Sequence, residues 1–321
     1  VDESQIIFTS GTTAGLNHLA KAIFEQDPKT VVAITDIDHH ANHLPWLRES
    51  QKKGRSLCIV PTQDGRISPQ NLEAFLKEHN VTLLAFPWVS NIFGTAQDLE
   101  AIFRIAQDQG VKTVVDACQG IAHYPSNILK DADAVVFSGH KMYGPTGVGV
   151  IRISEELTNK LPPFFVGGGM IDKVDYHDVT YAQSPSKFEA GTLPIAAIIG
   201  LRKAVEWLSE QDIDALRAEE IQRANDTRAI LKEQLPGVKI LTEDTKSTIV
   251  TFWHPDIPVF DVVRVLAEEH IAVRGGHHCV QPYHNKIGVK GTARISFAAY
   301  NSTEELTKLE HALITIKKIF V

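Results

Sequence analysis

Short apolar runs alternate with amphipathic stretches from residue 6 to residue 153, and this alternation restricts the possible folds more than any other feature. Several stretches with helical spacing separate the runs, among them Thr13–Gln26, Pro69–Glu78 and Asp98–Gln109. The alternation predicts a layered α/β domain with a mostly parallel sheet. The predicted strands are Ile6–Thr9, Val31–Thr35, Ser56–Val60, Val81–Phe86, Lys112–Asp116, Ala134–Phe137 and Val148–Ile153.

The rest of the chain has a different pattern. Leu161–Thr192 is rich in Gly, Pro and Ser and predicts a loop. Ile195–Leu235 has a helical pattern that is highly charged toward its end, and we expect it to connect two domains. From about Val238 the order is strand, helix, strand, polar loop, strand, helix, which predicts a small α+β unit. Its clearer elements are Val259–His270, Thr292–Phe297 and Thr303–Ile319. We therefore predict a large domain over residues 1–205 and a small C-terminal domain over residues 206–321.

Charge and cysteine content exclude several classes of function. The net charge is −7 and no long Lys/Arg run is present, which argues against a nucleic-acid surface. No apolar run is as long as a membrane span. The three cysteines, Cys58, Cys118 and Cys279, have no CxxC spacing, so we expect neither a disulfide framework nor a zinc site. This pattern favours a reducing compartment, and we expect a cytoplasmic protein.

Lys141 follows a predicted buried strand in "VVFSGHKMYGPTGVGV". Lysine is rarely buried without a partner or a covalent task, and its amine is a useful nucleophile toward carbonyls. Ligands of open α/β sheets bind beyond the carboxyl ends of the strands, where Lys141 lies. The cofactor pyridoxal phosphate needs such a lysine, a carboxylate for its pyridine nitrogen and donors for its phosphate.

The other groups that this cofactor needs also follow predicted strands. Asp116 ends "KTVVD", and Gln119 follows it closely. "SGTTAG" places Thr12 and Thr13 where a strand passes into a helix, whose N-terminus would attract a phosphate. Each feature alone has an ordinary interpretation as a helix cap, a turn or a surface histidine. Ser138 and His140 are further candidate donors, and His39 offers a ring that could stack on the cofactor.

Cys279 lies in "VRGGHHCVQP", which is not a core pattern. A free cysteine is often only a small buried hydrophobe, as we expect for Cys58 in "SLCIV". Arg274, His277 and His278 lie close to Cys279 in sequence, and cationic neighbours favour the thiolate form. We therefore predict that Cys279 is a nucleophile on a flexible polar loop.

Six motifs spread from Phe8 to Tyr300 resemble the class V aminotransferase-like family of pyridoxal-phosphate enzymes. Within it, "GHHC" and the downstream arginine are most similar to SUF-type (group II) cysteine desulfurases and selenocysteine lyases. The resemblance implies the fold of type I pyridoxal-phosphate transferases, with a large mixed, mostly parallel sheet flanked by helices and a small α+β C-terminal domain. The motifs are "FTSGTT", "DHHANHLPW", "VVDACQG", "FSGHKMYGPTGVGV", "FEAGT" and "VRGGHHC".

The resemblance also implies roles. Lys141 would bind pyridoxal phosphate and move the substrate's Cα proton, while Asp116 pairs with the pyridine nitrogen and Gln119 with the ring hydroxyl. His39 would stack on the ring and take part in catalysis. Cys279 would take sulfur from L-cysteine as a persulfide, leave L-alanine, and pass the sulfur to an acceptor protein for iron–sulfur cluster assembly. The implied phosphate ligands are Thr12, Thr13, Ser138, His140 and, from the second subunit of a homodimer, Thr192; the implied substrate-binding residues are Asn91, Arg274, His277 and Arg294.

The sequence departs from the family pattern in three places. Related enzymes have a further segment before "IIFTSGTT", so we expect that an N-terminal segment is missing from this sequence. Gly275 replaces the usual threonine of "RTGHHC", and the loop Gly167–Met170 is one residue tighter. Two alternatives stay open: a selenocysteine lyase or a cysteine/cystine C–S lyase of the same fold, and a truncated non-catalytic homologue that acts as a binding partner.

Overall fold

The computed structural model describes residues 2–244 and 246–321. The chain divides into two compact units. Unit 1 comprises the chain up to Pro61, Ile67–Trp88 and Gln97–Gln211, and unit 2 comprises Thr62–Arg66, Val89–Ala96 and Asp212–Val321. Two short segments from the first half of the chain thus belong to unit 2. The functional division at residue 205 stays a prediction.

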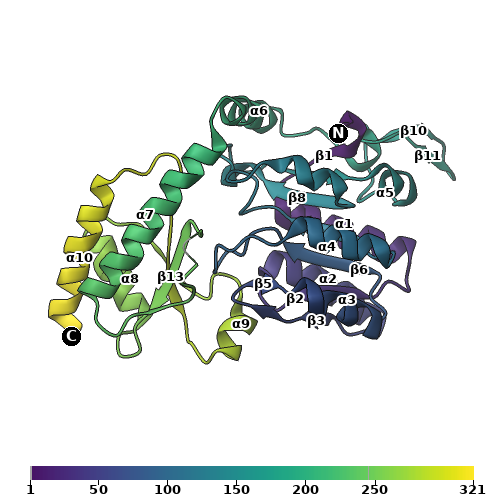
Figure 1. Cartoon of the computed structure of the whole chain (residues 1–321). Helices are drawn as coiled ribbons and strands as arrows, with labels where there is room; N and C mark the ends of the chain where they lie inside the picture. The colour runs from purple at the N-terminus through teal and green to yellow at the C-terminus, as the bar shows by residue number, and fades with distance from the viewer. Residues whose placement is uncertain (1, 245) are drawn as a thin grey trace. The chain divides into compact units, whose positions relative to one another are not determined.

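A seven-stranded mixed sheet forms the centre of unit 1 (Figure 1). β9 is antiparallel to both of its neighbours, and the other pairs are parallel. This confirms the predicted mostly parallel mixed sheet. The strand order is β1 (Ile6–Thr9), β9 (Gly149–Ile153), β8 (Ala134–Ser138), β7 (Lys112–Asp116), β6 (Leu83–Pro87), β2 (Val32–Thr35) and β3 (Cys58–Val60).

Helices of unit 1 pack on this sheet through apolar faces. In α4 (Leu99–Asp108) the buried residues recur at helical spacing, and the Asp98 carboxylate caps its N-terminus. α1 (Thr12–Gln26) approaches the sheet closely at Gly15, where a Cβ would lie 2.7 Å from a Val136 methyl carbon. The remaining helices of this unit are α2 (His40–Lys52), α3 (Pro69–Glu78), α5 (Glu155–Lys160), α6 (Ile195–Ser209) and the 3-10 turns η1 (Glu3–Gln5), η2 (Ser126–Asp131), η3 (Gly139–Lys141) and η4 (Ser186–Phe188).

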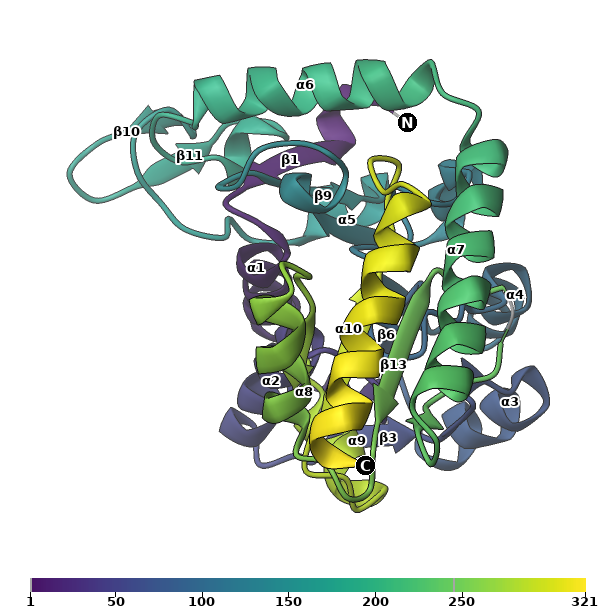
Figure 2. The same cartoon turned by 90° about the vertical axis from the view of Figure 1, so that its left-hand side faces the viewer.

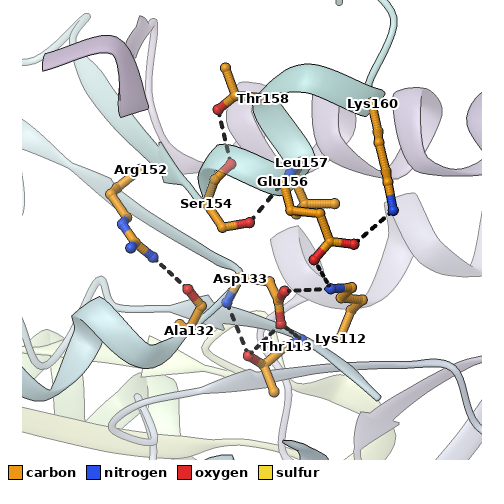
Figure 3. A network of polar contacts seen from close by, with 10 residues as sticks. All are labelled: Lys112, Thr113, Ala132, Asp133, Arg152, Ser154, Glu156, Leu157, Thr158 and Lys160. Carbon is orange, nitrogen blue, oxygen red and sulfur yellow. Dashed lines mark hydrogen bonds and ion pairs between the residues drawn. The ribbon is translucent and has the colours of Figure 1, made fainter. Parts of the chain in front are cut away.

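A polar network joins the N-terminal ends of β7 and β8 to α5 (Figure 3). The Lys112 ammonium lies 2.6 Å from the Glu156 carboxylate and 3.2 Å from that of Asp133. Asp133 in turn accepts the backbone N–H of Thr113 at 2.9 Å. Because Lys112 and Asp116 are the two ends of β7, the charged residues of this network lie at the opposite end of the strand from the predicted site.

The segment 161–192 corrects one prediction. It contains a β-hairpin of β10 (Ile171–Val174) and β11 (Val179–Tyr181), where we predicted only loop. The hairpin projects from the rest of unit 1 in Figure 2. All four residues of β10 are exposed, so no buried face leaves an alternating apolar pattern in the sequence.

The helical prediction for Ile195–Leu235 is confirmed, apart from one break that we did not predict. The structure has two helices, α6 and α7 (Ile213–Gln234), with a break at residues 210–212. The Asp212 side chain accepts the backbone N–H of Ala215 at 3.0 Å, which starts the second helix at a new cap.

Unit 2 is a small α+β unit, as predicted. Its antiparallel sheet has the order β12 (Lys239–Ile240), β13 (Ile249–Trp253), β15 (Thr292–Ser296), β14 (Arg274–Gly276). Figure 1 shows α7, α8 (Val259–Glu268) and α10 (Glu304–Phe320) gathered on one face of this sheet, where they bury a shared apolar core. The short helix α9 (Gln281–Lys286) lies within the predicted polar loop, and β4 (Thr62–Gln63) pairs with β5 (Arg66–Ile67).

In the part of the chain that is described, no helix combines the length and the apolar character that crossing a membrane requires.

Candidate active site

The acid and the lysine of the predicted site lie at one edge of the parallel sheet. Asp116 is the last residue of β7 and pairs in register with Pro87 of β6 and Val136 of β8. β8 ends at Ser138, and Lys141 follows in the turn η3. Adjacent parallel strands therefore bring these groups to the same carboxyl-terminal edge.

Asp116 is a buried carboxylate that senses Lys141. Its side chain is 6% exposed and accepts the backbone N–H of Cys118 at 3.0 Å. Burial raises the pKa of Asp116, whereas this hydrogen bond and the positive charge of Lys141 lower it. The lysine is thus within electrostatic reach of the acid. An acid in such a place can pair with a cationic ring nitrogen.

The N-terminus of α1 is tied to both strand ends. The Thr12 hydroxyl lies 2.8 Å from Oγ of Ser138 and 2.8 Å from Sγ of Cys118. The Thr12 backbone N–H also donates to Ser138 Oγ at 2.9 Å, and the next residue, Thr13, is exposed. A helix N-terminus with adjacent hydroxyl groups is a suitable place for an anion such as phosphate.

Two glycines allow this turn to approach the sheet. Gly11, the N-cap of α1, has φ +146°, a conformation that L side chains rarely adopt. Gly149 on β9 lies beneath it, since a Cβ at Gly149 would be only 2.5 Å from the Gly11 Cα. The close approach holds Thr12 against Ser138 at the strand end.

His39 lies at the start of α2, as its N-cap residue. Its Nδ1 accepts the backbone N–H of Ala41 at 3.0 Å, so that nitrogen carries no proton. The ring is half-buried. This fixed orientation is compatible with the predicted stacking role.

Asp38, directly before His39, is a buried residue that we did not predict. It accepts the Thr35 hydroxyl at 2.7 Å and the Asn42 amide at 2.7 Å. Burial raises the pKa of Asp38 to about 7, against the lowering effect of these donors, and the nearby Asp116 raises it further. The carboxyl ties the end of β2 to the first turn of α2 and thereby holds the backbone at His39. The only sequence signal was an acidic residue inside "ITDIDHHAN".

Three other predicted ligands of unit 1 are less constrained. Gln119 is half-buried three residues after Asp116. His140 is exposed beside Lys141, and its pKa is lowered by burial and by the Lys141 charge. Thr192 is exposed in the segment before α6. None of the three contradicts its predicted role, and each role stays a prediction.

The predicted substrate and sulfur residues of unit 2 form a second cluster. The Arg274 guanidinium on β14 donates toward the Cys279 thiol at 3.4 Å. Arg274 and Arg294 pair in register on β14 and β15, and Arg294 donates to the backbone carbonyl of Asn91 at 2.9 Å. The pKa of Arg294 falls to about 10 because the group is buried and Arg274 is near, while the Cys279 thiol acts in the opposite direction.

Asn91 and His277 complete this cluster. The Asn91 side-chain amide donates to the backbone carbonyl of His278 at 2.8 Å, so this amide helps to hold the turn of Cys279. His277 packs its ring against that of His284 at 5.4 Å.

Comparisons with known proteins show the family of the chain. The family model "Aminotransferase class-V" matches residues 1–309. A probable cysteine desulfurase of Streptomyces coelicolor is 37% identical, with 98% of this chain and 78% of the relative aligned. The cysteine desulfurase CsdA of Escherichia coli is 34% identical, with 97% of this chain and 78% of the relative aligned.

Solved structures give the same result. The crystal structure of CsdA from Escherichia coli has a TM-score of 0.93 at 32% identity, covering 100% of this chain and 80% of that chain. The apo structure of a cysteine desulfurase from Thermococcus onnurineus also has a TM-score of 0.93 at 32% identity, covering 99% and 80%. The fold is therefore that of the pyridoxal-phosphate-dependent enzymes of fold type I. The chain belongs to the class-V aminotransferase family and, within it, to the cysteine desulfurases.

Proposed function

We infer that this protein is a pyridoxal-phosphate-dependent cysteine desulfurase that converts L-cysteine to L-alanine and holds the removed sulfur on Cys279 as a persulfide. One observation carries the inference: a buried carboxylate, Asp116, lies within electrostatic reach of Lys141 at the carboxyl edge of a parallel sheet. The relatives named cysteine desulfurase support the same reaction.

The residues of unit 1 fit pyridoxal phosphate. Asp116 offers a buried acid for the ring nitrogen, Lys141 offers an amine for the aldehyde, and Gln119 offers an amide for the ring hydroxyl. His39 offers a planar ring held by the backbone N–H of Ala41. The proposed phosphate donors are Thr12 and Thr13 at the N-terminus of α1, Ser138 at the end of β8 and His140 in η3. When bound, the cofactor supplies an electron sink for the substrate's Cα.

The work of the chain itself is to hold groups and move protons. Asp116, kept from water, preserves a positive charge on the ring nitrogen by ion pairing. Lys141 takes the proton from the substrate's Cα. In unit 2, Arg294 and Asn91 hold the substrate carboxylate, with Arg274 and His277 beside it. A planar guanidinium suits a carboxylate because it offers two parallel donors.

Cys279 performs the sulfur transfer. Its thiolate attacks the sulfur of the substrate, so that an S–S bond forms while the Cβ–S bond breaks. The electron pair of the broken bond goes to Cβ, which takes a proton and becomes the methyl group of alanine. The sulfur is oxidised and the carbon is reduced, so no external oxidant is needed. The persulfide then passes to an acceptor protein for iron–sulfur cluster assembly.

A homodimer also follows from this proposal. Thr192 would reach the phosphate of the second subunit. The neighbouring surface of unit 1 supports an interface, because large apolar side chains are exposed on α6 and on the β10–β11 hairpin. The most exposed are Ile195 (61%), Ile199 (57%), Val174 (60%) and Tyr176 (99%). A second copy of this chain is the simplest partner for such a surface. The three free cysteines suit a reducing cytoplasm.

The test is to load the purified protein with pyridoxal phosphate and supply L-cysteine. We expect a visible absorbance band that Lys141→Ala removes, and one alanine for each sulfur transferred. Lys290→Ala, a change to an exposed lysine of unit 2, is the matched control and should keep both. A protein that binds no pyridoxal phosphate, or binds it equally well without Lys141, would show that the proposal is wrong. Comparing L-selenocysteine with L-cysteine separates the lyase alternatives.

A further inference from the structure

The turn that carries Cys279 has an unusual backbone. His278 has φ +51° and Cys279 has φ +60°, both in the left-handed region. Residues other than Gly seldom adopt this conformation, although Asn, Asp and His do so more often than the rest, and two in succession persist only where the surroundings hold them. Something must therefore keep this turn in place.

His278 is the residue through which the turn is held. Its side chain is 2% exposed, and its Nε2 lies 3.0 Å from the backbone oxygen and 2.9 Å from the hydroxyl of Thr292 on β15. Its own carbonyl accepts the Asn91 amide at 2.8 Å. Both the backbone and the side chain of His278 are thus fixed, while Cys279 next to it remains half-buried.

The proton positions in this contact follow from the acceptors. His284 Nδ1 lies 3.0 Å from the Val280 carbonyl, which can only accept, so His284 Nδ1 carries the proton. Burial lowers the pKa of His284, so the ring is neutral and its Nε2 accepts the Thr292 hydroxyl at 3.1 Å. That hydroxyl has then used its only proton. It must accept from His278 Nε2–H, as the Thr292 carbonyl must also do.

The same reasoning assigns the rest of the His278 ring. Its Nδ1 carries no proton, and this buried atom has no hydrogen-bond partner among the residues described. A second proton would place a charge in a buried position near Arg294, and burial followed by that arginine lowers the pKa of His278 to about 3. His278 is therefore a neutral donor throughout the physiological range, suited to holding the turn and unsuited to transferring protons.

We propose that His278 is the positioning residue that keeps the Cys279 thiol beside the Arg274 guanidinium, through its Nε2–H donation to Thr292. Its importance for sulfur transfer rests on the proposed role of Cys279, but the positioning concerns contacts inside unit 2 alone. Without the anchor, the two strained residues would relax to ordinary backbone conformations. The thiol would then leave the 3.4 Å contact with Arg274.

The test compares alkylation of Cys279 in the folded protein by anionic iodoacetate and by neutral iodoacetamide, followed on the Cys279 peptide by mass spectrometry. The ratio of the two rates reports the cation beside the sulfur, because thiolate fraction and exposure affect both reagents alike. We expect His278→Asn to lower the ratio about threefold or more, the effect of one unit charge a few ångström away. Asparagine tolerates the left-handed backbone but is too short to reach Thr292. His278→Gln, whose amide nitrogen can replace Nε2, should keep the parent ratio.

Two controls separate positioning from general disturbance. His270 is an exposed histidine of the same unit with a left-handed backbone (φ +61°), so His270→Asn should leave the ratio unchanged. Arg274→Gln should lower the ratio by itself, and adding His278→Asn to it should change little, since both act on one contact. If His278→Asn does not fold, His278→Gly tests the same anchor and should lower the ratio, because glycine also tolerates the left-handed backbone and has no side chain to reach Thr292.

The proposal is overturned if the ratio of the Asn variant, or of His278→Gly in its place, equals that of the parent. It is also overturned if His278→Gln falls as far as His278→Asn, or if the effects of Arg274→Gln and His278→Asn multiply. The measurement needs neither cofactor nor substrate. A protein that fails to make alanine from cysteine but shows the expected ratios would therefore refute the desulfurase proposal and leave the positioning role intact.

Discussion

The Thr12 hydroxyl lies 2.8 Å from the Ser138 hydroxyl, across 126 residues of sequence. Ser138 also accepts the Thr12 backbone N–H and is only 5% exposed. This pair fastens the N-terminus of α1 to the end of β8, three residues before Lys141. The proposed phosphate ligands and the proposed lysine are therefore held by one buried contact.

Ser138→Ala should weaken cofactor binding. The change leaves the buried Thr12 N–H without its acceptor, which costs about 1–3 kcal/mol of stability. It also removes one proposed phosphate donor, so the affinity for pyridoxal phosphate should fall about tenfold or more. Titration of the visible absorbance measures the affinity. Ser209 lies at the exposed end of α6, where its hydroxyl donates a hydrogen bond. Ser209→Ala is the control and should bind pyridoxal phosphate with the affinity of the parent. Equal affinity in Ser138→Ala would remove Ser138 from the phosphate site.

Asp38→Asn should change how stability depends on pH. Burial raises the pKa of Asp38 from 3.8 to about 7. Between these values the folded protein keeps a proton that the unfolded chain has lost, so the stability contributed by Asp38 is greatest below about pH 4 and falls as the pH rises to about 7. The parent should thus lose about 2–3 kcal/mol relative to Asp38→Asn between about pH 5 and about pH 7.

Urea unfolding of the cofactor-free protein at these two pH values measures the difference. The amide of Asp38→Asn faces the same donors as the carboxyl and adds a cost that does not depend on pH, so only the change with pH is diagnostic. Asp108→Asn, at the exposed end of α4, should follow the parent at both pH values. A parallel pH dependence for parent and Asp38→Asn would mean that Asp38 is ionised throughout.

Cys118 should resist alkylation in the folded protein. Burial, followed by the nearby Asp116 charge, raises the pKa of Cys118 to about 12. At about pH 8 its thiolate fraction is roughly one in ten thousand, whereas an ordinary thiol near pKa 8.5 is about one quarter ionised. Iodoacetamide should therefore label Cys118 about a thousandfold more slowly in native buffer than in urea. Similar rates in the two solvents would show that this strand end opens readily.

Strongly patterned elements were predictable from the sequence, and long-range contacts were not. β1, β7 and α3 have the predicted bounds, because β1 has an alternating buried pattern, β7 a nearly continuous buried run and α3 a clear helical face. The break between α6 and α7 was missed because both helices satisfy the same helical propensities, and only the cap at Asp212 separates them. The exposed hairpin of β10 and β11 has no buried face to reveal it.

For the site, motif recognition predicted the candidate reactive residues, and the residues that hold them came only from the structure. Asn91 was predicted as a substrate ligand, yet its amide contacts the His278 carbonyl 187 residues away, a contact that no local pattern encodes. The sequence gives no signal for Thr292 or His284 either, since a buried threonine and a helical histidine have many ordinary explanations. The burial of Asp38 could not be predicted from the sequence, because it depends on the packing of α2 over this residue.

Gly275→Ala tests the departure from the family motif. A Cβ at Gly275 would lie 2.8 Å from a methyl carbon of Val263 on α8. Overpacking of this kind costs about 1–3 kcal/mol, which urea unfolding would detect. Combining Gly275→Ala with Val263→Ala removes the clash. Gly275→Ala should therefore cost less stability in the Val263→Ala variant than in the parent. Gly168→Ala, where no neighbouring atom lies within 4 Å, should be nearly neutral. Equal stabilities of Gly275→Ala and the parent would mean that α8 shifts without cost.

The mass of the Cys279 peptide after one turnover tests the account most directly. The protein is loaded with pyridoxal phosphate, given L-cysteine without any sulfur acceptor, and digested after blocking. We predict one added sulfur atom on Cys279 and one alanine for each sulfur, while Cys279→Ser forms neither but still binds the cofactor with the parent's absorbance. If Cys279→Ser releases sulfide from cysteine at the parent rate, with no sulfur ever found on Cys279, the C–S lyase reaction is the correct one and the desulfurase account is contradicted.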